Sequence, residues 1–276
     1  MVCRVSNCCR WWLVMARCCR FRSPLMARSW RSEMLPFWIA LQFLGSLPIS
    51  LPGMPRPEES GRSLLFYPLV GALFGTLLLG FSAVLDGAPL VLHAALVLCA
   101  WVLLSGGLHL DGLADSADAW LGGFGDRERT LKIMKDPRSG PIAVVTLVLV
   151  LLLKFAAILA LLDSQSSIGL LLAPLIGRAA MLALFLGTPY VRAGGLGQAL
   201  ADHLPRSAGR KVLLASAFAC VLLAGWSGAA ALLVCSVCFF WLRQAMMRRL
   251  GGSTGDTAGA LLELLELAVL LTLALL

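Results

Sequence analysis

The feature that most constrains this chain is a series of long apolar runs, each close to the length needed to cross a bilayer. Such a span takes about 20 apolar helical residues. Only helices or closed barrels satisfy the backbone hydrogen bonds there, and these runs are continuous rather than alternating, which favours helices. The runs cover residues 65–85, 89–106, 141–162, 168–189, 212–242 and 258–276.

The composition excludes an ordinary soluble protein. Only 14% of the 276 residues are charged and 59% are hydrophobic, whereas a soluble domain has about a quarter of its residues charged. We therefore predict an all-α, polytopic integral membrane protein.

The run 212–242 is too long for one ordinary span, and its midpoint Gly225-Trp226-Ser227-Gly228 is a turn signal. Splitting it there gives about seven transmembrane helices. The split also places three basic segments, 107–140, 190–211 and 243–257, on one face, which the positive-inside rule assigns to the cytoplasm. The N-terminus then lies inside and the C-terminus outside. The apolar segment 35–51 ends in a proline-rich stretch, and we expect it to lie in the interface or to re-enter.

Residues 1–33 differ sharply from the rest of the chain. They hold seven arginines and one acid, for a net charge of +6. The apolar stretch in this leader is too short for a signal peptide. A basic arm on anionic lipid is one interpretation; we favour translation from Met34, with residues 34–276 as a single membrane-embedded catalytic domain. The cysteines, including Cys235 and Cys238, give no sign of an oxidising compartment.

Asp111, Asp115 and Asp118 carry the strongest chemical signal. Their spacing of i, i+4 and i+7 puts all three carboxylates on one narrow stripe of a helix. Carboxylates this close repel one another unless a cation lies among them, and Mg²⁺ commonly bridges carboxylates to substrate phosphates. A solvated acidic helix face is the alternative, which apolar neighbours such as Leu113 disfavour.

Five cations follow the aspartates before the next span: Arg127, Arg129, Lys132, Lys135 and Arg138. Carboxylates for a metal beside cations for phosphate are the parts of a phosphoryl-transfer site. We favour Lys135 and Arg138 as substrate contacts; the other three serve equally well to hold the loop at anionic lipid. His109 lies on the other side of the helix, where we expect it to pack or hydrogen-bond.

Two further polar features stand out near apolar runs. Arg178 lies midway along one run, where an unpaired guanidinium is costly; it either binds substrate or pairs with a buried carboxylate. The loop 251–257 offers backbone N–H groups of Gly252, Thr254 and Gly255 to phosphate, and Asp256 can complete a metal shell.

Together these motifs resemble the cobalamin synthase family, over nearly everything from Met34 onward. The segment HLDGLADSADAWLGG at 109–123 is the strongest match. Further matches are the segments IMKDPRSG at 133–140, GRS at 61–63, YPLVG at 67–71, PYVR at 189–192, GLG at 195–197 and GSTGD at 252–256.

The resemblance implies a multi-pass enzyme of the bacterial inner membrane, with its active-site loops in the cytoplasm. It implies that adenosylcobinamide-GDP is joined to α-ribazole or its 5′-phosphate and that GMP is released, with Mg²⁺ required. We expect Asp111, Asp115, Asp118 and Asp256 to hold metal. Lys135, Arg138 and Arg192 would neutralise the phosphoryl group, and Asp118 would deprotonate the attacking hydroxyl. No nucleic-acid partner is expected, and homo-oligomerisation stays open.

Two rival interpretations remain. A CDP-alcohol phosphotransferase-like lipid enzyme shares the Asp-Gly-x-x-Ala start of its signature, but has arginine where this chain has Asp115. A cation transporter could use the acidic stripe as its ion site, although transporters bind near the bilayer midplane and these aspartates lie close to a loop.

Overall fold

The structure, a computed structural model, describes residues 30–51, 53–192, 194 and 196–276. The predicted leader 1–33 falls almost wholly outside these residues, so its role and the start at Met34 stay predictions. Within the described ranges the chain forms helices joined by short loops, with one isolated β-bridge and no strand. The elements are α2 (Trp30–Leu44), α3 (Pro57–Ser63), η1 (Leu64–Phe66), α4 (Tyr67–Val84), α5 (Leu90–Ser105), α6 (Leu108–Gly122), α7 (Arg127–Ile133), α8 (Pro141–Asp163), α9 (Gly169–Gly187), α10 (Leu196–Asp202), α11 (Arg206–Leu250) and α12 (Gly255–Leu275).

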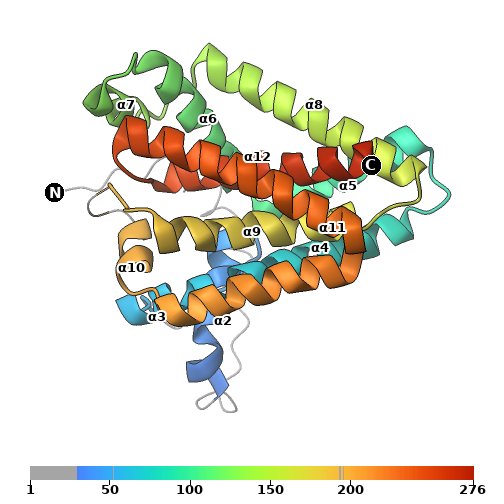
Figure 1. Cartoon of the computed structure of the whole chain (residues 1–276), viewed down its shortest axis with the longest axis horizontal. Coiled ribbons are helices and arrows are strands. Elements are labelled where there is room, and N and C mark those ends of the chain that lie inside the picture. Colours follow the sequence, from blue (N-terminus) through green and yellow to red (C-terminus); the bar gives the residue numbers. More distant parts are fainter. Residues whose placement is uncertain (1–29, 52, 193, 195) are drawn as a thin grey trace.

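The predicted set of about seven spanning helices is confirmed in outline. Five helical stretches of the described chain are long and apolar enough to cross a membrane, and the bent pair of α5 and α6 adds a sixth. One of the five, α11, is two helices joined at Gly225, whose backbone is not helical (φ 54°, ψ −128°). The ribbon of α11 reverses direction along its length (Figure 1). The split predicted at 225–228 is therefore confirmed.

Close packing between α4 and α9 depends on two glycines of α4. A Cβ atom on Gly71 would lie 2.4 Å from the Pro174 carbonyl oxygen, and one on Gly75 would lie 2.6 Å from the Leu171 Cα. Small residues that let helix backbones approach are the usual device for packing in lipid. The Gly-x-x-x-Gly signal in the sequence thus marks a real helix–helix contact, and α9 and α12 form the buried centre of the bundle.

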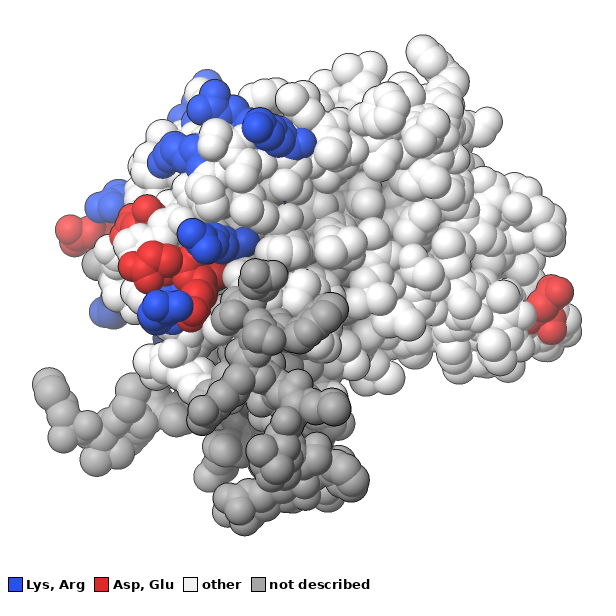
Figure 2. Space-filling view, turned by 90° about the horizontal axis from the view of Figure 1, so that it is seen from below, with Lys and Arg blue, Asp and Glu red and all other residues white. Residues whose placement is uncertain are grey.

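Charge is distributed unevenly along the bundle axis. Charged side chains gather at one end, while the surface between the two ends is almost entirely uncharged (Figure 2). The basic loops before α8, α11 and α12 lie together at the end that carries α7 and α10, and the C-terminus lies at the other end (Figure 1). Large apolar side chains of α8 and α11 are exposed on the uncharged surface, as expected for helices that face lipid.

Candidate active site

The three aspartates predicted to share a stripe lie on α6, which turns sharply away from α5. The two helices meet at 87°, and the turn is made by Gly106 and Gly107, both left-handed with φ of 68° and 70°. Side-chain-bearing residues rarely adopt this conformation, so the paired glycines make the turn possible. The bend directs α6 along the charged end of the bundle, with Asp111 exposed and Asp115 and Asp118 half-buried.

Asp256, predicted to complete a metal shell, lies in the first turn of α12. A Cβ atom on Gly112 would lie 2.8 Å from the Asp256 backbone carbonyl oxygen, so the two helices nearly touch at this point. Asp115 lies within electrostatic reach of Asp111, Asp118 and Asp256, with Arg192 as the opposing charge. Four carboxylates therefore converge from two helices that are far apart in sequence.

Asp118 has a hydrogen-bonding role that the sequence does not reveal. Its two carboxylate oxygens accept backbone N–H groups from Gly140 and, at 2.9 Å, from Ala143. Gly140 is the N-cap of α8 and Ala143 lies in its first turn. Backbone N–H groups at this end of a helix have no acceptor within the helix. Asp118 thereby caps α8 from a neighbouring helix and holds the basic loop before α8 against α6.

A short backbone clamp links two of the motifs from the sequence. Tyr190 and Ser253 form a parallel bridge, with the Val191 N–H donating to the Ser253 carbonyl at 2.9 Å and the Ser253 N–H donating to the Pro189 carbonyl at 2.8 Å. Arg192, next along the chain, donates from Nη1 to Asp256 Oδ2 at 2.9 Å. Burial raises the pKa of the Tyr190 phenol, so this ring stays protonated beside the clamp.

The predicted phosphate loop is built around this clamp. Gly252 is buried, and a Cβ there would lie 2.3 Å from the Pro189 carbonyl oxygen, so only glycine fits. Thr254 is the N-cap of α12, its hydroxyl accepting the Thr257 N–H at 3.2 Å. Of the three residues predicted to offer backbone N–H groups to phosphate, Gly252 and Thr254 are buried and Gly255 is exposed.

The cations at this end of the bundle differ in the contacts that they make. Arg127 donates to the Leu250 carbonyl at 2.7 Å, and Arg249 donates to the Thr130 hydroxyl and the Trp120 carbonyl, which tie the loop to the end of α11. Lys135 is exposed. Arg138 is exposed and pairs with Asp136 at 2.9 Å, and this hydrogen bond lowers the pKa of the Asp136 carboxyl.

Arg178 lies in a buried ion cluster. Of the two roles that the sequence left open, the structure shows the pairing with a buried carboxylate. Arg178 is 0% exposed and pairs with Glu266, while Lys154 Nζ bonds Glu263 at 2.6 Å and Glu266 at 2.7 Å. The cluster of Lys154, Arg178, Glu263 and Glu266 joins α8, α9 and α12. The buried position of this cluster gives no support to substrate binding by Arg178.

His109 is buried near the cluster, and both of its ring nitrogens lack a hydrogen-bond partner in the described structure.

The sequence reasoning missed Lys154 and Glu266. The signal was present, since Lys154 is a lone cation inside an apolar run and Glu266 lies three residues after Glu263 on the last span. Charged residues in such spans are costly and usually pair with one another.

The donor set suits Mg²⁺, although the described side chains form no preassembled group of three ligands. All four aspartates present oxygen, which this hard cation prefers, and Mg²⁺ is usually bound through one or two carboxylates plus waters and substrate phosphates. An incomplete protein shell is therefore compatible with this metal.

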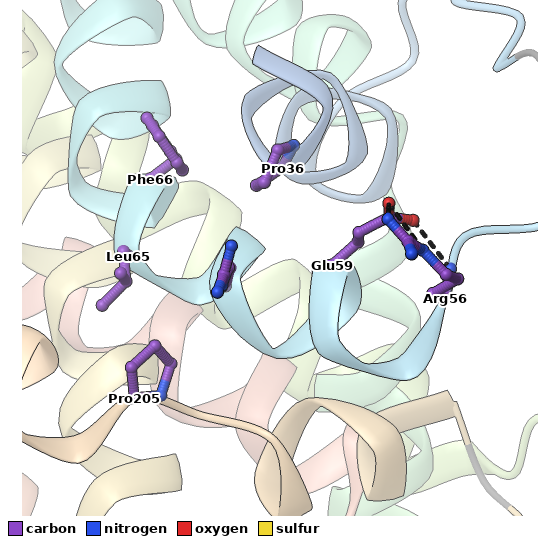
Figure 3. A pocket seen from close by; sticks show the side chains of 7 residues that line it. Pro36, Arg56, Glu59, Leu65, Phe66 and Pro205 are labelled. Atoms are coloured by element: carbon purple, nitrogen blue, oxygen red, sulfur yellow. Dashed lines mark hydrogen bonds and ion pairs between the residues drawn. The ribbon is translucent and has the colours of Figure 1, made fainter. Parts of the chain in front are cut away.

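A separate cavity of about 370 Å³ lies between α2, α3 and the start of α11 (Figure 3). Arg56 and Glu59 pair across 2.7 Å at its edge, and Pro36, Leu65, Phe66 and Pro205 supply apolar walls. None of the aspartates lines it, so the candidate site is the acidic surface of α6 and α12 rather than this cavity.

Fold and site together define a class, a multi-pass helical membrane protein with an acidic site flanked by cations at its charged end. A family model described as cobalamin-5-phosphate synthase matches residues 36–274. The chain belongs to this family.

Three similar curated proteins share the name adenosylcobinamide-GDP ribazoletransferase. The chain is 89% identical over 243 residues to the protein of that name from Pseudomonas savastanoi pv. phaseolicola, covering 88% of this chain and 100% of the relative. It is 88% identical over 243 residues to that of Pseudomonas syringae pv. syringae, with the same coverage. It is 78% identical over 242 residues to that of Pseudomonas fluorescens Pf-5, again covering 88% and 100%. No solved structure matches the chain.

Proposed function

We propose that this protein is an adenosylcobinamide-GDP ribazoletransferase. It transfers the adenosylcobinamide phosphate moiety to α-ribazole or its 5′-phosphate, forming adenosylcobalamin or its 5′-phosphate and releasing GMP. The observation that carries the proposal is the 89% identity to a relative of that name over the relative's whole length. The CDP-alcohol phosphotransferase and cation transporter interpretations receive no support from the family match.

The reaction replaces a phosphoanhydride bond to GMP with a phosphate ester bond to the ribose. A ribose hydroxyl oxygen forms a bond to the phosphorus that carries cobinamide, the bond from that phosphorus to the bridging oxygen of the diphosphate breaks, and GMP leaves with that oxygen. The hydroxyl proton passes to a carboxylate. Mg²⁺, when bound, stabilises charge on the diphosphate and improves GMP as a leaving group.

The residues of the site suit these tasks. Asp111, Asp115 and Asp256 offer oxygen ligands on the facing surfaces of α6 and α12. We assign the neutralisation of phosphoryl charge to Lys135 and Arg138, both of which are exposed. Arg192 orients Asp256 through their hydrogen bond at 2.9 Å. Gly255 adds a backbone N–H at the start of α12, where an anion is favoured.

Two aspartates are candidates for the base that takes the hydroxyl proton. Asp118 fits the role by its place in the stripe, but each of its oxygens already accepts a backbone N–H group. No such bond engages Asp115 among the described residues, and the charges of Asp111 and Asp256 both act on it. We propose that Asp115 or Asp118 takes the proton, with Asp118 retaining its structural contact to α8.

The decisive experiment uses the full chain reconstituted in liposomes with adenosylcobinamide-GDP, α-ribazole and Mg²⁺. GMP and corrinoid product are measured with and without EDTA. We expect both products to form, to vanish with EDTA, and to fall by at least about a hundredfold in Asp115→Asn, the scale of general acid–base catalysis. Asp163→Asn, at the opposite end of the bundle, is the matched control. A folded wild-type protein that makes neither product would refute the proposal.

A further inference from the structure

A second groove lies at the charged end, away from the aspartates, and combines an apolar wall with three arginines. It encloses about 530 Å³ between the end of α9 and both arms of α11. Arg206, Arg210 and Arg243 line it together with Leu186, Phe239 and Phe240. None of its nine lining residues is acidic. The groove therefore presents concentrated positive charge beside an apolar surface.

The groove lies at the level where the spans meet the basic loops. α9 ends at Gly187, the first arm of α11 starts at Arg206, and the second arm approaches its end at Arg243. The residues that follow the lining residues Leu213 and Phe240 along α11 are apolar and exposed: Leu214 is 72% and Trp241 71% exposed. An arginine cluster at this boundary, continuous with a lipid-facing surface, faces headgroups on one side and acyl chains on the other.

Capping of α9 explains only part of this charge. Arg243 donates to the Gly187 carbonyl at 2.6 Å and to the Thr188 hydroxyl at 3.0 Å, and Arg206 donates to the Leu186 carbonyl at 3.1 Å. Cations at a helix C-terminus are favourable. Arg210 has no such role, because no hydrogen bond or ion pair joins its exposed side chain to a described residue. The two anchored arginines hold their guanidinium groups in place, and Arg210 completes a site with free donors.

We infer that this groove binds one anionic phospholipid, with the phosphodiester held by Arg206, Arg210 and Arg243 and an acyl chain along Phe239, Phe240 and Leu213. Guanidinium groups suit this ligand because their planar donor pairs match phosphate oxygens. The apolar wall selects a lipid over a soluble phosphate. The inference does not depend on the proposed reaction, since none of these residues belongs to the acidic site.

The test measures lipid retained by the purified full chain. Wild type is reconstituted in nanodiscs of phosphatidylcholine with a minor share of phosphatidylglycerol, extracted in mild detergent and examined by native mass spectrometry. We expect one phosphatidylglycerol to be retained preferentially. Arg210→Gln should weaken its binding about fivefold, the effect of one cation near an anionic lipid surface. Arg210→Lys keeps the charge but loses the planar donor pair, so its binding should fall between that of wild type and that of Arg210→Gln.

Lys211→Gln is the matched control, since it removes the same charge from the next exposed position of α11, outside the groove. Equal retention of the two lipids by wild type, or equal weakening by Lys211→Gln and Arg210→Gln, would overturn the inference. Inorganic phosphate and GMP are added in separate arms. Displacement of the lipid by either at equal concentration would show that the groove takes a soluble phosphate, which would also overturn it.

Discussion

Asp115 and Asp118 lie one helical turn apart on α6, yet their surroundings assign them different tasks. Asp118 bonds the N-terminal backbone of α8, whereas Asp115 faces the other carboxylates of the site. An Asp→Asn substitution removes the charge but keeps the shape of the side chain. It should distinguish the two residues, because only Asp118 holds the N-terminus of α8.

We expect Asp118→Asn to lower both stability and activity. The amide keeps one acceptor but turns a donor toward a backbone N–H, so one of the contacts to Gly140 and Ala143 is lost. Loss of a helix N-terminal cap costs about 1 kcal/mol, which should lower the thermal unfolding midpoint in detergent. Asp115→Asn should leave that midpoint unchanged while abolishing activity. Equal midpoints for both variants would contradict the capping role.

At the scale of elements, the contact between α6 and α12 determines whether four carboxylates can share one site. Gly112→Ala should weaken activity strongly, because its Cβ would meet the Asp256 carbonyl at 2.8 Å and push the two helices apart. Overpacking of this kind costs about 1–3 kcal/mol. Gly80→Ala on α4 is the control, since a Cβ there meets nothing within 4 Å. Product formation in liposomes measures both, and wild-type activity in Gly112→Ala would contradict the close approach.

The buried ion cluster makes a different element-scale prediction. Removing Lys154 alone, as in Lys154→Met, leaves Glu263 without its partner and Glu266 with Arg178 only. Breaking a buried pair in this way costs about 3–5 kcal/mol. We expect the double variant Lys154→Met/Glu263→Gln to be more stable than Lys154→Met, because it removes one charge of each sign. The measurement is the thermal unfolding midpoint of wild type, both single variants and the double variant. If the shifts of the two single variants add up to that of the double variant, Lys154 and Glu263 are not coupled.

These elements also show how far sequence reasoning reaches. Apolar run length and the Gly225 turn signal predict the spans and the reversal of α11, because both are local properties. The spacing of Asp111, Asp115 and Asp118 predicts a shared stripe for the same reason. The pairing of Lys154 with Glu263 and Glu266, and the capping of α8 by Asp118, depend on which helices become neighbours. No periodic pattern in a single sequence shows which helices pack against each other.

For the whole molecule, the separation of charge along the bundle sets its expected orientation. The basic segments before α8, α11 and α12 share one end, and the short turns after α4, after α8 and at Gly225 lie at the other. Because Lys and Arg are retained on the cytoplasmic side, the charged end should face the cytoplasm of a bacterial inner membrane. The candidate active site would then lie where soluble nucleotide substrates are present.

Cysteine labelling tests this orientation. In a variant without the nine native cysteines, Glu128→Cys places a thiol in the exposed basic loop, and Ser164→Cys places one in the exposed turn after α8. In intact spheroplasts a membrane-impermeant maleimide should label Ser164→Cys and leave Glu128→Cys unlabelled, while both should react after lysis. The reason is that the bilayer bars the reagent from the cytoplasmic end. Labelling of Glu128→Cys but not Ser164→Cys in spheroplasts would place the aspartates outside the cell membrane and contradict a cytoplasmic active site.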